Sequence, residues 1–197
     1  MMMRKFLGVM AAVCMMWAAL LPVGEAAAPS GKVQGTVTWR YSLVRSTQGI
    51  GDQKPIAGID IISSGTQDKI YKDRGARVEL IPFFFDKESI TSSQEQDWYT
   101  RGIAPAGSNI FVAETDEDGN YLIENIPEGT YELVLISGRA KSNSIPPEQE
   151  ALMKRYVRNW DVFDLFVLNG SNYIMKRVIV QPGVPVVENY EFEAPRS

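Results

Sequence analysis

Hydrophobic and polar positions alternate most clearly between Glu114 and Gly138, where two turn signals separate three apolar runs. The first signal contains Asp118 and Gly119; glycine takes positive φ without steric cost, and Asp or Asn side chains bond their own backbone in turns. The second contains Pro127 and Gly129. Short apolar runs around such turns favour strands, and those flanking the first turn favour a hairpin. The predicted strands are 110–114, 120–124 and 130–136.

The same period of two predicts strands elsewhere in the chain. Val33, Val37, Trp39 and Tyr41 share one face of a half-buried strand, and polar residues occupy the other face. Further strands are predicted at 76–80, 173–180 and 186–193, with Tyr190 and Phe192 facing the core in the last. Residues 48–75 are predicted mainly as a connection, in which 59–62 can pair as a short edge strand.

A polar segment, residues 86–108, predicts a long surface loop with at most one helical turn, and loops of this length are often functional. It carries Trp98, Tyr99 and Arg101. Exposed aromatic rings can stack on sugars or anchor a protein partner, so these three residues are the candidate contacts. The alternative is that the loop folds back and the two rings cover the sandwich.

A helix is predicted from Pro146-Pro147 onwards, because proline and acidic residues suit a first helical turn. Leu152, Tyr156, Trp160 and Phe163 recur at helical spacing, and this stripe is expected to pack on a sheet. An alternative breaks the helix at Asn159 and makes 162–168 a strand, hairpinned through Asn169-Gly170. Separately, the run Phe83–Phe85 forces at least one ring outward from a strand, which marks a candidate interface.

The N-terminal segment is typical of an export signal. Arg4 and Lys5 precede an uncharged, mostly apolar stretch, and small residues end at Ala28. We therefore predict a signal peptide at 1–28, a domain at 29–197, and a protein that is periplasmic, on the cell surface or secreted. A retained membrane anchor is the alternative. A lipid on Cys14 is less favoured, because apolar sequence continues past it.

Composition excludes several chemistries. The chain has no histidine, and its single cysteine, Cys14, lies in the predicted signal. Histidine-based triads, histidine zinc sites, disulfides and cysteine nucleophiles are therefore not expected in the domain. The chain's net charge is −4, and removal of Arg4, Lys5 and Glu25 (net +1) leaves −5, which argues against nucleic acid as a partner.

An acid-rich stretch at 114–119 has the spacing of the first half of a calcium loop. Asn125 stands where that loop needs glutamate, and no helices are predicted on either side. A plain turn is therefore favoured, and we predict no metal, no cofactor and no catalytic residues.

Taken together, the strand order resembles the carboxypeptidase regulatory-like domain, a prealbumin-like (transthyretin-like) β-sandwich. The resemblance covers about half of the chain after residue 28, and insertions at 42–74, 86–108 and 139–172 lie outside it. The matching segments are VQGTV (33–37), GARVEL (75–80), TDEDGNY (115–121), IPEGTYEL (126–133) and VIVQPG (178–183).

The resemblance implies an all-β fold: a seven-stranded Greek-key sandwich with one inserted α-helix and long loops. Members of this family are usually non-catalytic modules of exported proteins. It therefore implies a structural or protein-interaction role in the cell envelope or a secreted assembly, with an unidentified protein partner and no enzymatic activity. The alternative function is a carbohydrate- or peptide-binding module that uses the 86–108 loop. A hydrolase built from carboxylates is a third, less favoured hypothesis.

Overall fold

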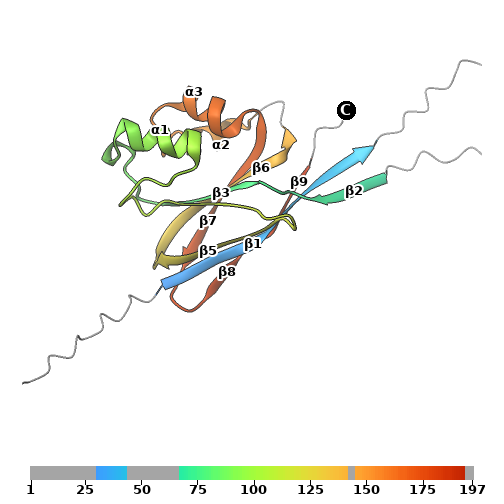
Figure 1. Cartoon of the computed structure of the whole chain (residues 1–197), viewed down its shortest axis with the longest axis horizontal. Coiled ribbons are helices and arrows are strands. Elements are labelled where there is room, and N and C mark those ends of the chain that lie inside the picture. Colours follow the sequence, from blue (N-terminus) through green and yellow to red (C-terminus); the bar gives the residue numbers. More distant parts are fainter. Residues whose placement is uncertain (1–29, 44–66, 142–144, 194–197) are drawn as a thin grey trace, which may run out of the picture.

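A computed structural model of the protein describes residues 30–43, 67–141 and 145–193. These residues form a five-stranded sheet, a four-stranded sheet and a layer of short helices, with the four-stranded sheet in the middle (Figure 1). The predicted all-β sandwich is confirmed at this level. The predicted signal at 1–28 and edge strand at 59–62 lie outside the described residues.

The five-stranded sheet is organised around the long strand β1 (Ser30–Leu43), which has different neighbours along its two halves. Its first half pairs with β5 (Asn120–Pro127) and β8 (Pro185–Val187). Its second half pairs with β2 (Gln67–Lys72) and β9 (Tyr190–Glu193). Figure 1 shows that the end of β1 and its partner β2 project beyond the rest of the molecule.

The four-stranded sheet runs in the order β4-β3-β6-β7, and all its pairings are antiparallel. Its strands are β3 (Arg77–Pro82), β4 (Phe111–Glu114), β6 (Gly129–Lys141) and β7 (Ser171–Val180). One face packs on the five-stranded sheet around Val37, Leu80 and Leu133. The other face packs under the helices around Ile81, Val134 and Met175. The middle sheet is thus buried on both faces over much of its length.

The helical layer comprises three α-helices rather than the one predicted. They are α1 (Ser92–Arg101), α2 (Pro147–Met153) and α3 (Trp160–Phe163), accompanied by a 3₁₀ turn η1 (Lys87–Ser89) and a π-helical turn η2 (Asp164–Leu168). The predicted single helix after Pro146 is interrupted between Met153 and Trp160, and the alternative strand at 162–168 is wrong because that segment is helical. The stripe itself packs as expected: Tyr156 and Phe163 are buried in the core beneath the helices.

Three strand predictions need correction. The described residues hold nine strands rather than seven, and β2 lies in the segment predicted mainly as a connection. The predicted hairpin at 110–124 is wrong, because β4 belongs to the four-stranded sheet and β5 to the other. The turn between them crosses from one sheet to the other. The reason is a long-range contact: the Val37 backbone N–H donates to the Gly119 carbonyl at 2.8 Å, which fixes the turn on β1.

Candidate interaction surface

Trp98 and Tyr99, the predicted exposed contacts, are buried, with 0% and 1% of their surface exposed. They lie on α1, which replaces the predicted loop. Thr91 caps α1 in a reciprocal capping box with Gln94, and Gly102 ends it at φ 66°. The predicted exposure of the two rings is therefore wrong, and the alternative in which they cover the sandwich is the one observed. The capping residues were the signal that could have shown it.

A buried ion pair fixes α1 on the sheet. The Arg77 Nε donates to Glu79 Oε1 at 2.6 Å, and its Nη2 donates to the Trp98 carbonyl at 2.6 Å. At the other side of α1, Glu95 accepts from the Tyr99 hydroxyl at 2.7 Å and from Arg158 at 2.9 Å. Burial, followed by the hydrogen bond from Tyr99 to Glu95, raises the pKa of the Tyr99 hydroxyl. These contacts hold the rings of Trp98 and Tyr99 in the core between α1 and the middle sheet.

Arg101 does extend into solvent from the last turn of α1, where it pairs with Asp97 at 3.1 Å. Because Trp98 and Tyr99 point into the core, the three predicted contact residues do not form a common surface. A ring stacked on a ligand at this position would have to leave the core first.

The predicted turn residues lie where the chain crosses between sheets. Asp116 Oδ1 accepts from the backbone N–H groups of Asp118 and Asn120, at 2.9 and 2.8 Å, and Gly119 has a φ of 75°. The Asp116 carboxylate, which a calcium loop would use as a ligand, thus binds backbone N–H groups of its own turn. At the second crossing, the Tyr131 hydroxyl donates to the Pro127 carbonyl at 3.0 Å, just before Gly129.

The helices leave one end of the middle sheet bare. Along β7, Tyr173 and Met175 are buried under the helices, and the next two side chains on that face are Arg177 and Ile179. Ile179 is 65% exposed and lies opposite Thr130 of β6. The Phe83 backbone N–H donates to the Thr130 carbonyl at 3.0 Å, which places the Phe83–Phe85 turn beside them. We call Phe83, Phe84, Thr130, Arg177 and Ile179 the uncovered face.

Phe84 is the most exposed large apolar side chain on this face, at 89%. The expectation that one ring of the Phe83–Phe85 run points outward is thereby met. Its ring meets the Phe83 ring edge-on, with the centroids 4.8 Å apart. A groove of about 360 Å³ adjoins both rings and continues past Tyr131, Asp86 and Glu128.

Two arginines meet at the Phe83 ring. The Arg177 Cζ lies 4.0 Å from the ring centroid, and the Arg155 Cζ lies 5.7 Å from it. Arg177 also donates to Glu132 Oε1 at 2.7 and 3.0 Å, and Glu132 is buried. The uncovered face therefore combines exposed apolar groups with guanidinium groups, a composition that is enriched in protein interfaces.

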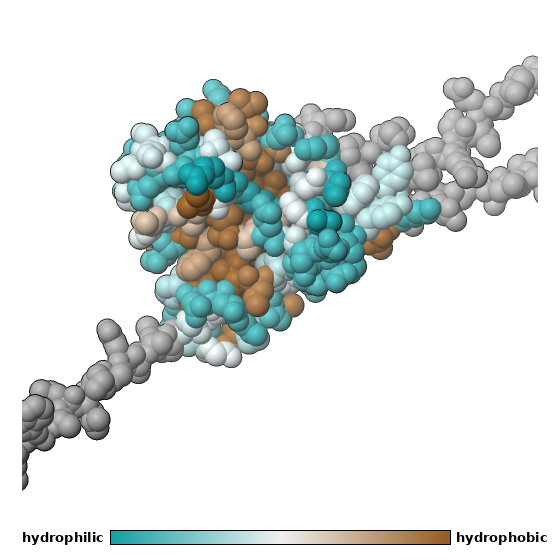
Figure 2. Space-filling model, viewed as in Figure 1, coloured by the Kyte–Doolittle hydropathy of each residue, from teal (hydrophilic) through white to brown (hydrophobic). Residues whose placement is uncertain are grey.

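Apolar residues are also exposed at other places. Figure 2 shows hydrophobic residues over the helical layer and across the middle of the molecule, bordered by polar ones. In the helical layer, the exposed apolar residues include Leu165 and Phe166 of η2. On the projecting β1–β2 ribbon, Trp39 and Tyr71 pair across the strands and stack, with centroids 5.1 Å apart and an interplanar angle of 24°. Tyr71 is 43% exposed, so this pair, which the sequence analysis does not single out, is more accessible than Trp98 and Tyr99.

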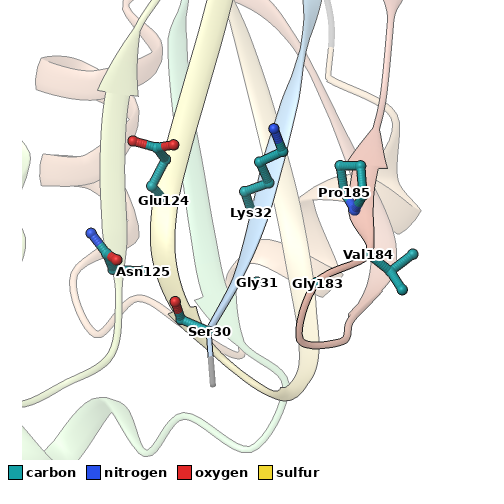
Figure 3. A pocket seen from close by; sticks show the side chains of 8 residues that line it. All are labelled: Ser30, Gly31, Lys32, Glu124, Asn125, Gly183, Val184 and Pro185. Carbon is teal, nitrogen blue, oxygen red and sulfur yellow. The ribbon is translucent and has the colours of Figure 1, made fainter. Parts of the chain in front are cut away.

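A small pocket of about 180 Å³ lies at the start of β1 (Figure 3). Its polar side chains come from Ser30 and Lys32 of β1 and from Glu124 and Asn125 of β5. Val184 and Pro185 line it near β8. It brings together one cation and one carboxylate, without an aromatic ring. This set suits a small polar group.

Within residues 30–43, 67–141 and 145–193, no group of three or more acidic, histidine or cysteine side chains could hold a metal ion. None of the helices described there is long and apolar enough to cross a membrane.

Comparisons with known proteins give weak likenesses. No protein-family model matches the sequence, and no curated protein matches it significantly. Among solved structures, it is similar to the minor pilin GBS52 of Streptococcus agalactiae, with 11% identity and a TM-score of 0.39 over 86% of this chain and 46% of that one. The chain thus spans about half of that pilin's length.

A second similar structure is PA1324 from Pseudomonas aeruginosa, to which carbohydrate binding has been assigned only provisionally. The identity is 15% and the TM-score 0.35, over 85% of this chain and 92% of that one. At such scores, neither likeness carries an argument about what this protein does.

Proposed function

We propose that this protein is a non-catalytic, exported domain that binds another protein in a cell-envelope or secreted assembly through the uncovered face. The observation that supports this most is the pair of exposed apolar side chains, Phe84 at 89% and Ile179 at 65%. Their neighbour Phe83 is only partly buried. Thr130 connects their segments, because it pairs with Ile179 and accepts the Phe83 N–H. Apolar groups gathered in one region of the surface are typical of binding sites, whereas single ones are ordinary.

The arrangement of the layers supports the same reading. If the helical layer were longer, it would cover Arg177 and Ile179 as it covers Tyr173 and Met175. A partner that packs there would complete the layer and bury the rings of the Phe83–Phe85 turn. We place the protein outside the cytoplasm because of its predicted signal at 1–28, with no role for nucleic acid and no membrane contact beyond that signal.

The test compares two double variants of the exported protein in capture experiments from its own host's envelope fraction. Phe84→Ser with Ile179→Thr should abolish saturable capture of a protein partner. Leu122→Ser with Val187→Thr is the matched control, because both residues are exposed apolar positions on the opposite, five-stranded sheet. Equal capture by both variants and the original protein would exclude the uncovered face as the binding site.

A carbohydrate-binding role is the second candidate, and the observation that favours it is the stacked pair Trp39–Tyr71 rather than the 86–108 segment. Rings that project on a ribbon can stack on sugars. Tyr71→Ala should then remove binding on a glycan array, while Phe84→Ser should leave it unchanged. If neither the original protein nor the variants bind glycans, this candidate fails and the protein-binding proposal is unaffected.

Export itself is tested by the mass of the mature protein in its host. Recovery outside the cytoplasm of a chain that begins near Ala28 would support cleavage. A cytoplasmic chain that still carries Met1 would contradict the proposed location.

A further inference from the structure

We propose that the groove beside Phe83 and Phe84 binds a basic side chain of the partner, an arginine or a lysine. The cation pairs with the carboxylates of Asp86 and Glu128, and the apolar stem of the same side chain lies against the Phe84 ring. This inference rests on the proposed protein-binding function and specifies the chemistry that the partner must present to this groove.

The groove lies where three segments meet at one end of the middle sheet. The turn after β3 supplies Phe83, Phe84 and Asp86, the loop before β4 supplies Ser108, and the turn between β5 and β6 supplies Glu128. Because β3 lies between β4 and β6 in the sheet, the end of β3 and the starts of its two neighbours lie side by side. The groove therefore collects side chains that are distant in the sequence.

Negative charge is the electrostatic character of the groove. Among the described residues that line it, Asp86 and Glu128 are the only charged ones. Both are exposed, and neither forms an ion pair with any residue that the structure describes. One oxygen of Asp86, Oδ1, accepts from the Glu88 N–H at 3.0 Å, and its other oxygen receives no hydrogen bond from the described part of the chain. Such a lining complements a positively charged group of a partner.

The basic residues nearby do not neutralise these two carboxylates. Arg155 and Arg177 stack on the Phe83 ring, but neither lines the groove. Arg177 pairs with the buried Glu132 instead. The Lys87 Nζ donates to two backbone carbonyls of the segment after α2, at 2.9 and 3.2 Å. The carboxylates of the groove are thus left for a cation from outside the described chain.

The aromatic wall suits the stem of a basic side chain. Phe84 is 89% exposed, and its ring meets the Phe83 ring edge-on. Arginine and lysine lay their apolar stems along apolar surface, and their charged groups are attracted to the faces of aromatic rings. An acidic side chain has a shorter stem, and both carboxylates of the groove would repel it.

Hydrogen bonds fix the wall of the groove before a partner binds. The Phe85 N–H donates to the Pro82 carbonyl at 2.9 Å, which closes the turn that carries Phe84. The Ser89 N–H donates to the Asp86 carbonyl at 3.0 Å. A site that is already ordered loses less conformational entropy on binding, so its contacts contribute more to affinity.

The experiment selects capped random heptapeptides on the immobilised exported protein at physiological salt. Peptides that carry Arg or Lys should be enriched over those that carry Asp or Glu. The double variant Asp86→Asn with Glu128→Gln should weaken the best peptide at least tenfold, as expected for the loss of one charge-assisted bond or more. Asparagine also caps helical turns, so this variant removes charge and keeps the cap of η1.

The matched control is Asp118→Asn with Glu117→Gln. Both acids are exposed in the turn at the other end of β5 from Glu128, and this variant has the same net charge as the test variant. It should leave the affinity unchanged. Arg155→Gln should not weaken the peptide either, because a basic side chain does not need that guanidinium. Equal losses in the two double variants would indicate general attraction to an acidic chain and overturn the inference.

The other outcomes distinguish this inference from the function on which it rests. Peptides that need Phe84 but show no basic preference would overturn the inference and leave the protein-binding function standing. Acidic peptides that need Arg155 would do the same. Absence of any binding peptide would also overturn the inference, and the capture experiment with Phe84→Ser and Ile179→Thr decides the proposed function independently.

Discussion

The contact between Arg77 and Glu79 makes a sharp prediction, because it holds α1 on the middle sheet. Glu79 has 0% of its side chain exposed and Arg77 has 15%. Glu79 Oε1 accepts from Arg77, and its other oxygen, Oε2, is buried without a partner among the described residues. Arg77→Met would therefore leave a buried carboxylate with no compensating charge, and the Trp98 carbonyl with the Gly102 N–H as its remaining donor.

The expected cost follows from these losses. Removing one partner of a buried ion pair typically costs about 3–5 kcal/mol, and each neutral hydrogen bond adds about 1 kcal/mol. A typical domain is stable by about 5–15 kcal/mol, so Arg77→Met should lose a large share of its free energy of unfolding. The double variant Arg77→Met with Glu79→Leu removes both charges, and it should recover most of that loss, because apolar replacements of buried pairs are often neutral.

Urea unfolding followed by tryptophan fluorescence would measure both variants, since Trp98 lies at this contact. Arg74→Met serves as the control, because its partner Glu117 and its own side chain are largely exposed. Refutation would be a cost below about 1 kcal/mol for Arg77→Met, the range of an exposed pair, or a double variant less stable than the single one.

Three smaller predictions test other buried groups. Burial raises the pKa of Asp73 against opposing hydrogen bonds from Ser137 and Gly138, so the folded state favours its protonated form. The free energy of unfolding of the original protein, compared with that of Asp73→Asn, should therefore be most favourable at about pH 3, below the usual pKa. This advantage should fall as the pH rises through the folded-state pKa of Asp73. An advantage that grows with pH in parallel urea titrations would contradict this. The Tyr173 hydroxyl is buried without a partner in the described part of the chain, so Tyr173→Phe should be neutral or stabilising by up to about 1 kcal/mol, and a clear loss in thermal unfolding would reveal a hidden bond. Gly119→Ala combines positive φ with a Cβ only 2.4 Å from the Val37 carbonyl oxygen, so it should cost about 2 kcal/mol or more in urea, and an unchanged midpoint would show that the turn is not fixed on β1.

Local patterns were sufficient for most strands, but not for their pairing. The runs that became β4, β5 and β6 alternate in the sequence, and the turns between them contain residues with special backbone preferences. Those residues fix where the chain turns and do not determine which strand accepts the next one. The choice of sheet depends on contacts distant in the sequence, such as Val37 with Gly119. A turn that crosses between sheets and a hairpin turn look alike locally.

α1 and β2 are not predicted from the sequence for a different reason, which is that their residues are mostly polar. α1 reads SSQEQDWYTR, and only Trp98 and Tyr99 of it are buried. β2 reads QDKIYK, and its two apolar residues are both substantially exposed. Periodicity depends on a continuous buried face, so it cannot detect elements that bury one or two side chains. For α1, the tertiary bonds from Arg77 decide that those side chains face inward.

The uncovered face is partly predictable from the sequence, because the residue pattern of β7 indicates where it begins. Along one face of β7, the residues are Tyr173, Met175, Arg177 and Ile179, and the sequence changes character after Met175. A strand covered by helices over its whole length would continue with apolar residues, since an arginine there would be buried at a high cost. The change marks the point where the helical layer ends, and Ile179 beyond it has no cover from this chain's described residues. Alternation alone could reveal that boundary. Only the structure shows that Phe83, from the turn after β3, meets Arg177 there, and that Arg155 reaches the same ring from the segment after α2.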